Sequence, residues 1–174
     1  MAGFTEYAGR AGSETIAQSG SYVYVWSATD NYVSRYSTSG TKVDSSGPND
    51  FGDSYGACVG PDGRIWFTDY TNNRLWAVTS DMATLTSYST GFAGKGVCGI
   101  CSDGTDLFVA CLTTDQILKV TASTGAVAAT YSGTAGSGIF QICHSSGVRY
   151  FTCNSSHHIQ KFTISGATFS SRVS

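Results

Sequence analysis

Pairs of cysteines are the residues of this chain whose spacing comes closest to a redox or metal-binding motif. Cys98 and Cys101 stand three positions apart, in the spacing used by disulfide oxidoreductases and by half of a zinc site. A zinc site needs a second pair of ligands at similar spacing, and the other cysteines do not supply one. A redox or metal centre is therefore not predicted. The six cysteines could still form bridges, and the specific candidate is Cys98 with Cys111, across a hairpin that turns at Asp103-Gly104.

General acid-base chemistry has few candidate residues. His144 stands at one turn and His157-His158 in the next loop, and such loops lie at opposite ends of an antiparallel pair of strands. They are not expected to converge on one substrate. Glutamate occurs only at Glu6 and Glu14, and no nucleophile elbow, phosphate loop or paired-carboxylate arrangement is present. The sequence predicts no catalytic set and no cofactor, and thus a protein that is not an enzyme.

The loops carry the remaining side chains that could bind a ligand. Aromatic planes and planar amides suit hydroxylated ligands, so these loops could bind a sugar or a protein. The same residue types also serve turn geometry alone, and that alternative stays open. Asp50 and Asp53 could ligate calcium, but two carboxylates without further oxygen ligands are a weak signal. Asn154 begins a glycosylation sequon. The candidate ligand-binding residues are Asp30, Asn31, Asp50, Phe51, Asp53, Tyr70, Asn72, Asn73, Phe92 and Asp115.

A repeat of a little over forty residues organises these loops. Gly20, Gly63, Gly104 and Gly147 each stand in a turn, precede an apolar run, and are 43, 41 and 43 residues apart. This period is typical of one four-stranded propeller blade. Short β-rich runs alternate with turns, and no helix-length window has a helical apolar period. We predict one all-β domain over 1–174, a β-propeller with four-stranded blades at 14–46, 55–89, 97–132 and 139–173.

The residue types change from strand to strand within each predicted blade. First strands are small and apolar, which suits the crowded axis of a ring, so we expect them innermost. Second strands are apolar on both faces, as for a sheet between two neighbouring sheets. Fourth strands are rich in hydroxyls, as for an outer edge. A two-sheet sandwich is the alternative, because short strands with turns suit it too.

Three cysteines follow the repeat. Cys58, Cys101 and Cys143 occupy the same place in successive first strands, where the first unit has Ala17. A small apolar filler explains a thiol that replaces alanine. We therefore expect most thiols to be free and buried.

The second unit carries the most distinctive segment. Residues 56–69 read GACVGPDGRIWFTD and residues 72–75 read NNRL. This segment resembles the repeat of NHL-type propellers and of streptogramin (virginiamycin B) lyases, with a small-residue strand, a Pro-Asp-Gly turn, a Trp-Phe-Thr-Asp strand and an Asn-Arg-hydrophobic strand. The resemblance implies a propeller fold. The lyases' activity depends on His and Glu side chains clustered on one face with magnesium, and Glu6 and Glu14 do not allow that set to be carried over.

Composition limits the classes of partner. Charged residues make up 13% of the chain and the formal net charge is −2, so the basic stripe that binds nucleic acid is missing. Apolar runs are only strand-length, which predicts no membrane span. The N-terminal residues lack the basic and apolar regions of a secretory signal.

These observations favour a protein that presents surface over one that catalyses. The leading hypothesis is a structural or assembly subunit, such as a component of a virion or of an extracellular surface filament. The alternative is a module that binds carbohydrate or another ligand. A second alternative is a diverged enzyme similar to the lyases, which metal-dependent turnover would favour.

Counting strands predicts self-association. The four blades use residues 14–173, and Gly3-Phe4-Thr5-Glu6-Tyr7 reads as a further strand within the surplus segment 1–12. A closed ring of four blades lies at the small end of the known range, and an open half-ring exposes the flanks of its end blades. We expect two half-rings to close into eight blades, or neighbours to exchange the N-terminal strand. A closed four-bladed ring is the alternative.

Overall fold

Four antiparallel four-stranded sheets make up the computed structural model, which describes residues 13–47, 50–132, 138–155, 157–162 and 172–173. Each sheet follows chain order and is called a blade here. Blade 1 contains β1 (Ser13–Ser19), β2 (Tyr22–Ser27), β3 (Tyr32–Ser37) and β4 (Lys42–Ser46). Blade 2 contains β5 (Ala57–Val59), β6 (Ile65–Asp69), β7 (Arg74–Val78) and β8 (Leu85–Tyr88). Blade 3 contains β9 (Val97–Ser102), β10 (Leu107–Cys111), β11 (Gln116–Thr121) and β12 (Ala126–Ser132). Blade 4 contains β13 (Ile139–Ser145), β14 (Val148–Cys153), β15 (His158–Phe162) and β16 (Arg172–Val173).

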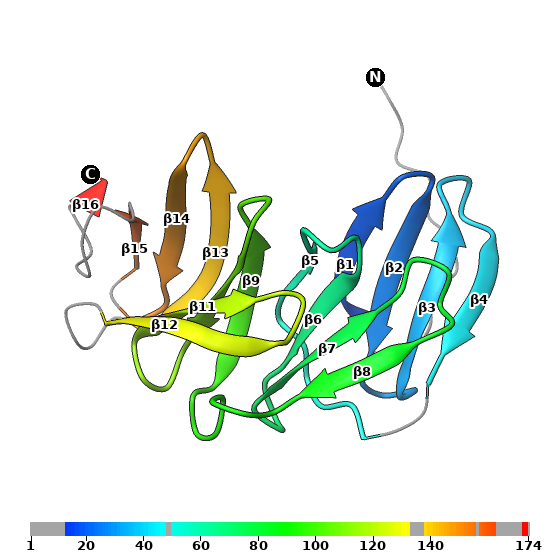
Figure 1. The fold of residues 1–174 in the computed structure, drawn as a ribbon, viewed down its shortest axis with the longest axis horizontal. Helices are drawn as coiled ribbons and strands as arrows, with labels where there is room; N and C mark the ends of the chain where they lie inside the picture. Colours follow the sequence, from blue (N-terminus) through cyan, green and yellow to red (C-terminus); the bar gives the residue numbers. More distant parts are fainter. Residues whose placement is uncertain (1–12, 48–49, 133–137, 156, 163–171, 174) are drawn as a thin grey trace.

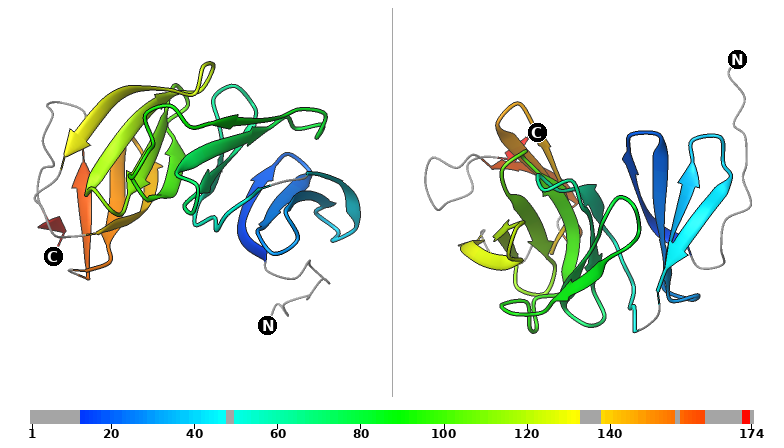
Figure 2. Two further views of the ribbon diagram at one scale, coloured as in Figure 1. Left: turned by 90° about the horizontal axis from the view of Figure 1, so that it is seen from below. Right: turned by 45° about the vertical axis from the view of Figure 1, so that its right-hand side comes forward.

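The blades stand side by side in chain order around one axis (Figure 1). Their first strands contact one another in sequence, β1 with β5, β5 with β9 and β9 with β13. This confirms that first strands are innermost and that the fold is a β-propeller and not a sandwich. Figures 1 and 2 place blade 1 and blade 4 at opposite ends of the row, so the four blades form an open arc.

Glycine lets the first strands approach closely near the axis. A Cβ added at Gly56 would lie 2.6 Å from the carbonyl oxygen of Cys98 on the next first strand. A Cβ added at Gly99 would lie 2.7 Å from Cα of Gln141. Both contacts are with backbone atoms, so no larger residue fits unless the strands move apart.

Apolar side chains fill the space between each pair of neighbouring blades. Between blades 1 and 2 lie Ala17, Tyr24, Trp26 and Val33 with Ile65, Phe67 and Val78. Between blades 2 and 3, Trp66, Leu75 and Ala77 pack on Leu107, Val109, Leu118 and Val120. Between blades 3 and 4, Cys101, Phe108, Ala110 and Ile117 pack on Ile139, Ile142, Phe151 and Cys153. The core is thus three layers, each shared by two sheets.

The two inner blades differ from the end blades in burial. Every residue of β6 and β10 is buried, which confirms that these second strands lie between two neighbouring sheets. In β2 and β14, buried residues alternate with partly exposed ones, because each end blade has one neighbour in the described chain. The fourth strands β4, β8 and β12 are half-exposed along their length, as expected for the rim.

The observed strands of the first three blades span 13–46, 57–88 and 97–132, within about two residues of the predicted blades at 14–46, 55–89 and 97–132. The expected strand within 1–12 lies outside the described residues, as do residues 163–171 of the fourth predicted blade. Among the described residues, no helix is long and apolar enough to cross a membrane.

Candidate functional site

The turns between second and third strands share one backbone geometry. Asn31, Asn73, Asp115 and His157 stand 42 residues apart and have φ values of 56°, 51°, 51° and 55°. Asparagine, aspartate and histidine are the non-glycine residues that most often adopt this left-handed conformation. Turn geometry therefore explains the residue type at three predicted ligand positions and at one of the histidines.

Two of these turn residues also join neighbouring blades. The side-chain oxygen of Asn73 accepts a hydrogen bond from the Gly96 amide at 2.7 Å, and Asp115 accepts one from the Gly138 amide at 2.6 Å. Each acceptor belongs to one blade and each amide lies in the connection to the next. We call this repeated contact the turn latch. Its sequence signal was the 42-residue spacing of Asn73 and Asp115.

The exposed side chain of Asn72 belongs to a network around the buried Asp69. The carboxylate of Asp69 is fully buried and accepts hydrogen bonds from Asn72 Nδ2 at 3.1 Å, Arg74 Nε at 2.8 Å and Trp76 Nε1 at 3.2 Å. Sequence reasoning named Asn72 but missed Asp69, although Asp69 ends the Trp-Phe-Thr-Asp strand. The network fixes the end of blade 2 against the connection from blade 1.

Asp50 and Asp53 lie in that connection. Arg74 donates to the carbonyl and the carboxylate of Asp50, the latter at 3.1 Å. The Asp53 carbonyl accepts from the Tyr70 amide at 2.8 Å. Among the residues that the structure describes, no group of three His, Cys, Asp or Glu side chains could hold a metal ion.

Phe51 and Phe92 lie in the core and not on the loop surface. Phe51 packs on Trp26, with ring centroids 4.1 Å apart, and edge-on against Trp76 at 4.8 Å. Phe92 is fully buried among the side chains between blades 2 and 3. The prediction that these two rings contact a ligand is wrong, because both are enclosed by neighbouring blades.

Three aromatic rings lie close together near the axis, at the end of the blades that carries the turns between second and third strands. Tyr55 packs edge-on against Tyr70 at 5.3 Å and tilted against Phe140 at 5.4 Å. Gln141 donates to the Tyr55 carbonyl at 2.6 Å, which ties blade 4 to the segment before blade 2. These rings, the axial aromatic group, remain partly exposed. Of the predicted ligand residues the group contains only Tyr70.

Asp30 lies in the β2–β3 turn, where its amide donates to Ser27 Oγ at 3.3 Å.

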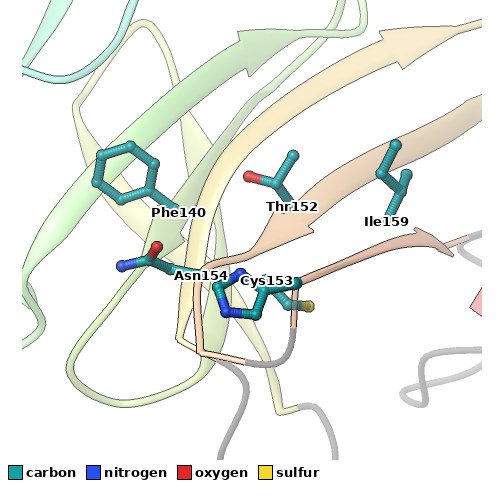
Figure 3. Close-up of a pocket in the computed structure, with 6 residues that line it drawn as sticks. Phe140, Thr152, Cys153, Asn154 and Ile159 are labelled. Carbon is teal, nitrogen blue, oxygen red and sulfur yellow. The ribbon is translucent and has the colours of Figure 1, made fainter.

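A shallow hollow of about 270 Å³ opens on the outward flank of blade 4. Figure 3 shows Thr152 and Ile159 on adjacent strands of its wall, with Phe140 and Asn154 near the loop end. Thr152 and Ile159 are register partners, so their side chains share one face of the sheet. Cys153 and His157 complete the lining. Apart from the sequon residue Asn154 and the already noted His157, sequence reasoning missed this surface.

The cysteines are free thiols, and the expected bridge between Cys98 and Cys111 is not formed. Cys98 Sγ donates to the Gly96 carbonyl at 3.2 Å, whereas Cys111 pairs with Val97 across the ladder and lies in the layer facing blade 2. Burial raises the pKa of Cys98 to about 11 and that of Cys111 to about 12. Cys143, on the outward flank of blade 4, is exposed.

His144 and His157 lie at opposite ends of β14. His144 accepts a hydrogen bond from the Gly147 amide at 3.1 Å in the turn between β13 and β14. His157 lies beyond the other end of β14. Among the side chains that the structure describes, His144 and His157 therefore do not share one substrate position.

Solved structures with the same arrangement of blades are known. The chain superposes on streptogramin B lyase with a TM-score of 0.82 and 21% identity, over 93% of this chain and 56% of that chain. It superposes on a catalytically inactive virginiamycin B lyase from Staphylococcus aureus with quinupristin, with a TM-score of 0.76 and 21% identity, over 89% of this chain and 53% of that chain. For hydrazine synthase of Kuenenia stuttgartiensis the TM-score is 0.75 at 14% identity, over 99% of this chain and 51% of that chain.

The chain thus spans about half the length of the structures that it matches. No protein-family model matches the sequence, and no curated protein matches it. At these identities the likeness concerns the fold alone. The chain has a β-propeller fold similar to that of streptogramin B lyase.

Proposed function

We propose that this chain is a structural, non-enzymatic β-propeller. It acts by binding blades of another protein chain at the outward sides of blade 1 and blade 4. The observation that carries the proposal is a pair of equivalent isoleucines. Ile117 on blade 3 is 0% exposed because blade 4 covers it, whereas Ile159, 42 residues later on blade 4, is 53% exposed. A side chain that the fold buries between blades is therefore repeated at the open end.

The other residues on the outward side of blade 4 can be compared with blade 3 at the same 42-residue offset. The side of each blade that faces the next blade is called its leading face, and the opposite side its trailing face. On blade 3 the leading face presents Phe108 and Ala110, which are buried against blade 4. On blade 4 the equivalent residues are Tyr150, which is half-buried, and Thr152, which is exposed. The leading face of blade 4 is therefore equivalent to a surface that blade 3 buries against its neighbour, and no blade of the described chain covers it.

The trailing face of blade 1 is exposed in part: Ser34 and Tyr36 on this face are buried, whereas residues of β1 and β2 beside them are not. Ile16 is 66% exposed, and Val23 and Val25 are half-buried. The residues equivalent to the two valines on blade 2, Ile65 and Phe67, are fully buried against blade 1. Complete burial of one such aliphatic side chain is worth about 1.5–3 kcal/mol, so covering both flanks would stabilise the arc considerably.

A tandem protein tests this proposal without depending on the natural partner. Two full copies are joined directly, residue 174 of the first to residue 1 of the second, so that blade 4 of the first can meet blade 1 of the second. We expect the tandem to unfold in urea at a higher midpoint than the single chain. Ile159→Glu in the first copy should remove the gain, and Ala128→Glu, on the exposed rim strand β12, should not. The single chain is measured at a concentration at which it is monomeric, and equal midpoints for the tandem and the single chain would then reject flank binding.

A second candidate function is a lyase, favoured by the likeness to streptogramin B lyase. The direct test incubates the purified chain with quinupristin and magnesium and follows the antibiotic by mass spectrometry. Turnover that a chelator abolishes would establish the enzyme and displace the structural proposal as the main function. Unchanged quinupristin would remove this candidate for that substrate.

Carbohydrate binding is the third candidate, and the partly exposed axial aromatic group favours it. Exposed tyrosine rings are suited to stack on sugar rings. A glycan array tests it, with Tyr70→Ala as the variant that should lose any signal. Membership of a virion or a surface filament rests on composition alone and stays a prediction.

A further inference from the structure

We infer that the partner of these flanks is a second copy of this chain, docked head to tail so that the leading face of blade 4 meets the trailing face of blade 1 of the next copy. The inference rests on the proposed function and adds the partner and the contacts. Each of the three interfaces within the chain joins a leading face to a trailing face. The two unpaired faces of the described chain are one of each kind.

Polar contacts on the leading faces follow a repeated rule. Tyr24 Oη and Arg35 of blade 1 donate to the Ser80 carbonyl of blade 2, at 2.7 and 2.6 Å. Arg64 of blade 2 donates to the Ala122 carbonyl of blade 3 at 2.5 Å. Ser80 and Ala122 are 42 residues apart, each in the turn after the third strand. On blades 1 and 2 the leading face therefore donates hydrogen bonds to that turn of the next blade.

Blade 4 and blade 1 carry the two halves of such a contact. Tyr150 is equivalent to Tyr24, and Lys161 is equivalent to Arg35. The residue of blade 1 equivalent to Ser80 is Thr38, an exposed residue in the turn after β3. In the docked pair, Tyr150 Oη and Lys161 Nζ of one copy donate to the Thr38 carbonyl of the next.

A buried threonine gives a second contact of the same kind. Thr68 Oγ1 accepts from the Gly56 amide of its own blade at 3.0 Å and donates to the Cys98 carbonyl of the next blade at 2.6 Å. Thr152 is its equivalent on blade 4 and accepts from the Gln141 amide at 3.1 Å. In the docked pair this hydroxyl donates to a carbonyl of the incoming β1, as Thr68 does to Cys98.

Apolar packing completes the match. Ile159 is equivalent to Val33, Leu75 and Ile117, each of which is buried against the trailing face of the following blade. On the incoming copy, Ile16, Val23 and Val25 supply that trailing face. The contact is heterologous, so two arcs form a closed ring of eight blades if the rotation closes and a longer assembly if it does not.

Light scattering on the purified chain tests the inference through complementation. We expect the unmodified chain to have the mass of a dimer or a larger assembly at micromolar concentration. Ile159→Glu and Ile16→Glu should each weaken association by about a hundredfold, because each buries an unpaired carboxylate. An equal mixture of the two variants should recover a dimer, because one pairing joins two unmodified faces. Ala128→Glu is the matched control and should keep the mass of the unmodified chain.

Other outcomes overturn the inference in distinct ways. A monomeric unmodified chain would exclude a second copy as partner, while a stabilised tandem protein would keep flank binding itself. Disruption by Ile159→Glu but not by Ile16→Glu would indicate two blade 4 flanks facing each other. Circular dichroism checks that the variants fold, and Tyr150→Phe provides a milder variant. It should weaken association by about two- to tenfold through loss of one hydrogen bond, and an unchanged affinity would contradict the docked geometry.

Discussion

Thr68 on blade 2 and Cys98 on blade 3 are joined by a hydrogen bond of 2.6 Å that crosses a fully buried interface. The same hydroxyl accepts from the Gly56 amide, so one side chain satisfies backbone groups on two first strands. A valine has nearly the same shape and no hydroxyl. The two backbone groups would then stay buried without this partner.

Thr68→Val should therefore lower the free energy of unfolding by about 1–3 kcal/mol, the cost of leaving buried polar groups unpaired. Urea denaturation measures it. Thr130→Val, on the exposed face of rim strand β12, is the control and should change stability little. Equal effects of the two substitutions would mean that the bond across the interface contributes nothing.

The turn latch can be separated into its side chain and its backbone conformation. Asn73→Gly keeps the left-handed turn and loses the bond to the Gly96 amide, for an expected cost of about 1 kcal/mol. Asn73→Ala also forces a residue with a Cβ into that turn and should cost about 1 kcal/mol more. Ser146→Gly, at a left-handed turn position on blade 4, should be neutral or slightly stabilising. Thermal or urea unfolding would distinguish the three, and a Gly variant as costly as the Ala variant would contradict this separation.

Two aspartates in ion pairs should differ sharply in their contribution to stability. Asp69 is fully buried beside Arg74, and Asp69→Ala should cost about 3–5 kcal/mol because the guanidinium loses its buried partner. Asp106 pairs with the partly exposed Lys119, and Asp106→Ala should cost about 1 kcal/mol or less. Urea midpoints of both variants check the contrast. Similar losses would show that the Asp69 network is solvated.

The buried thiols predict how stability depends on pH. Burial raises the pKa of Cys98 to about 11 and those of Cys101 and Cys111 to about 12, from an ordinary value of 9.0. The thiols thus stay protonated in the folded chain while those of the unfolded chain ionise. These three thiols leave the free energy of unfolding unchanged below pH 9 and should lower it as the pH rises from there toward 11 and 12. Cys111→Ala should flatten this fall in urea titrations across that range, and an unchanged slope would contradict it.

Thiol reagents give an independent measurement of the same property. At neutral pH the exposed Cys143 should react fastest in the native protein, and the buried Cys98, Cys101 and Cys111 only after unfolding. Rapid labelling of the three buried thiols in the native state would show that the layers between blades open readily.

The blades were predictable because both local and repeated signals agreed. The glycine turns at 43, 41 and 43 residues fixed the period, and alternating runs fixed the strands. The loop residues were harder, because Asn73 and Asp115 have the types expected of ligand contacts and of left-handed turns alike. Phe51 precedes Gly52 and Phe92 follows Gly91 in loops, and only the packing of the two rings shows that these loops fold inward.

The flank of blade 4 could not be recognised from composition. Ile159 has the same residue type as the buried Ile117, so no local pattern indicates that its neighbour is missing. The number of blades that close a ring depends on the rotation between sheets, which side-chain periodicity does not encode. The 42-residue equivalence of Ile117 and Ile159 identifies this flank only once the structure shows which face of each blade packs on the next blade.

The row of blades also sets the order in which the arc should come apart. Blades 2 and 3 each pack on two neighbours, whereas blades 1 and 4 pack on one, so nearest-neighbour energetics apply as in a linear array. Amide hydrogens in β6 and β10 should exchange slowly, with opening close to global unfolding, and those in β2 and β14 should exchange earlier through fraying from the two ends. A chain released alone would therefore begin to lose structure at both of its flanks, and capping either flank would slow exchange there while leaving the middle of the arc unchanged.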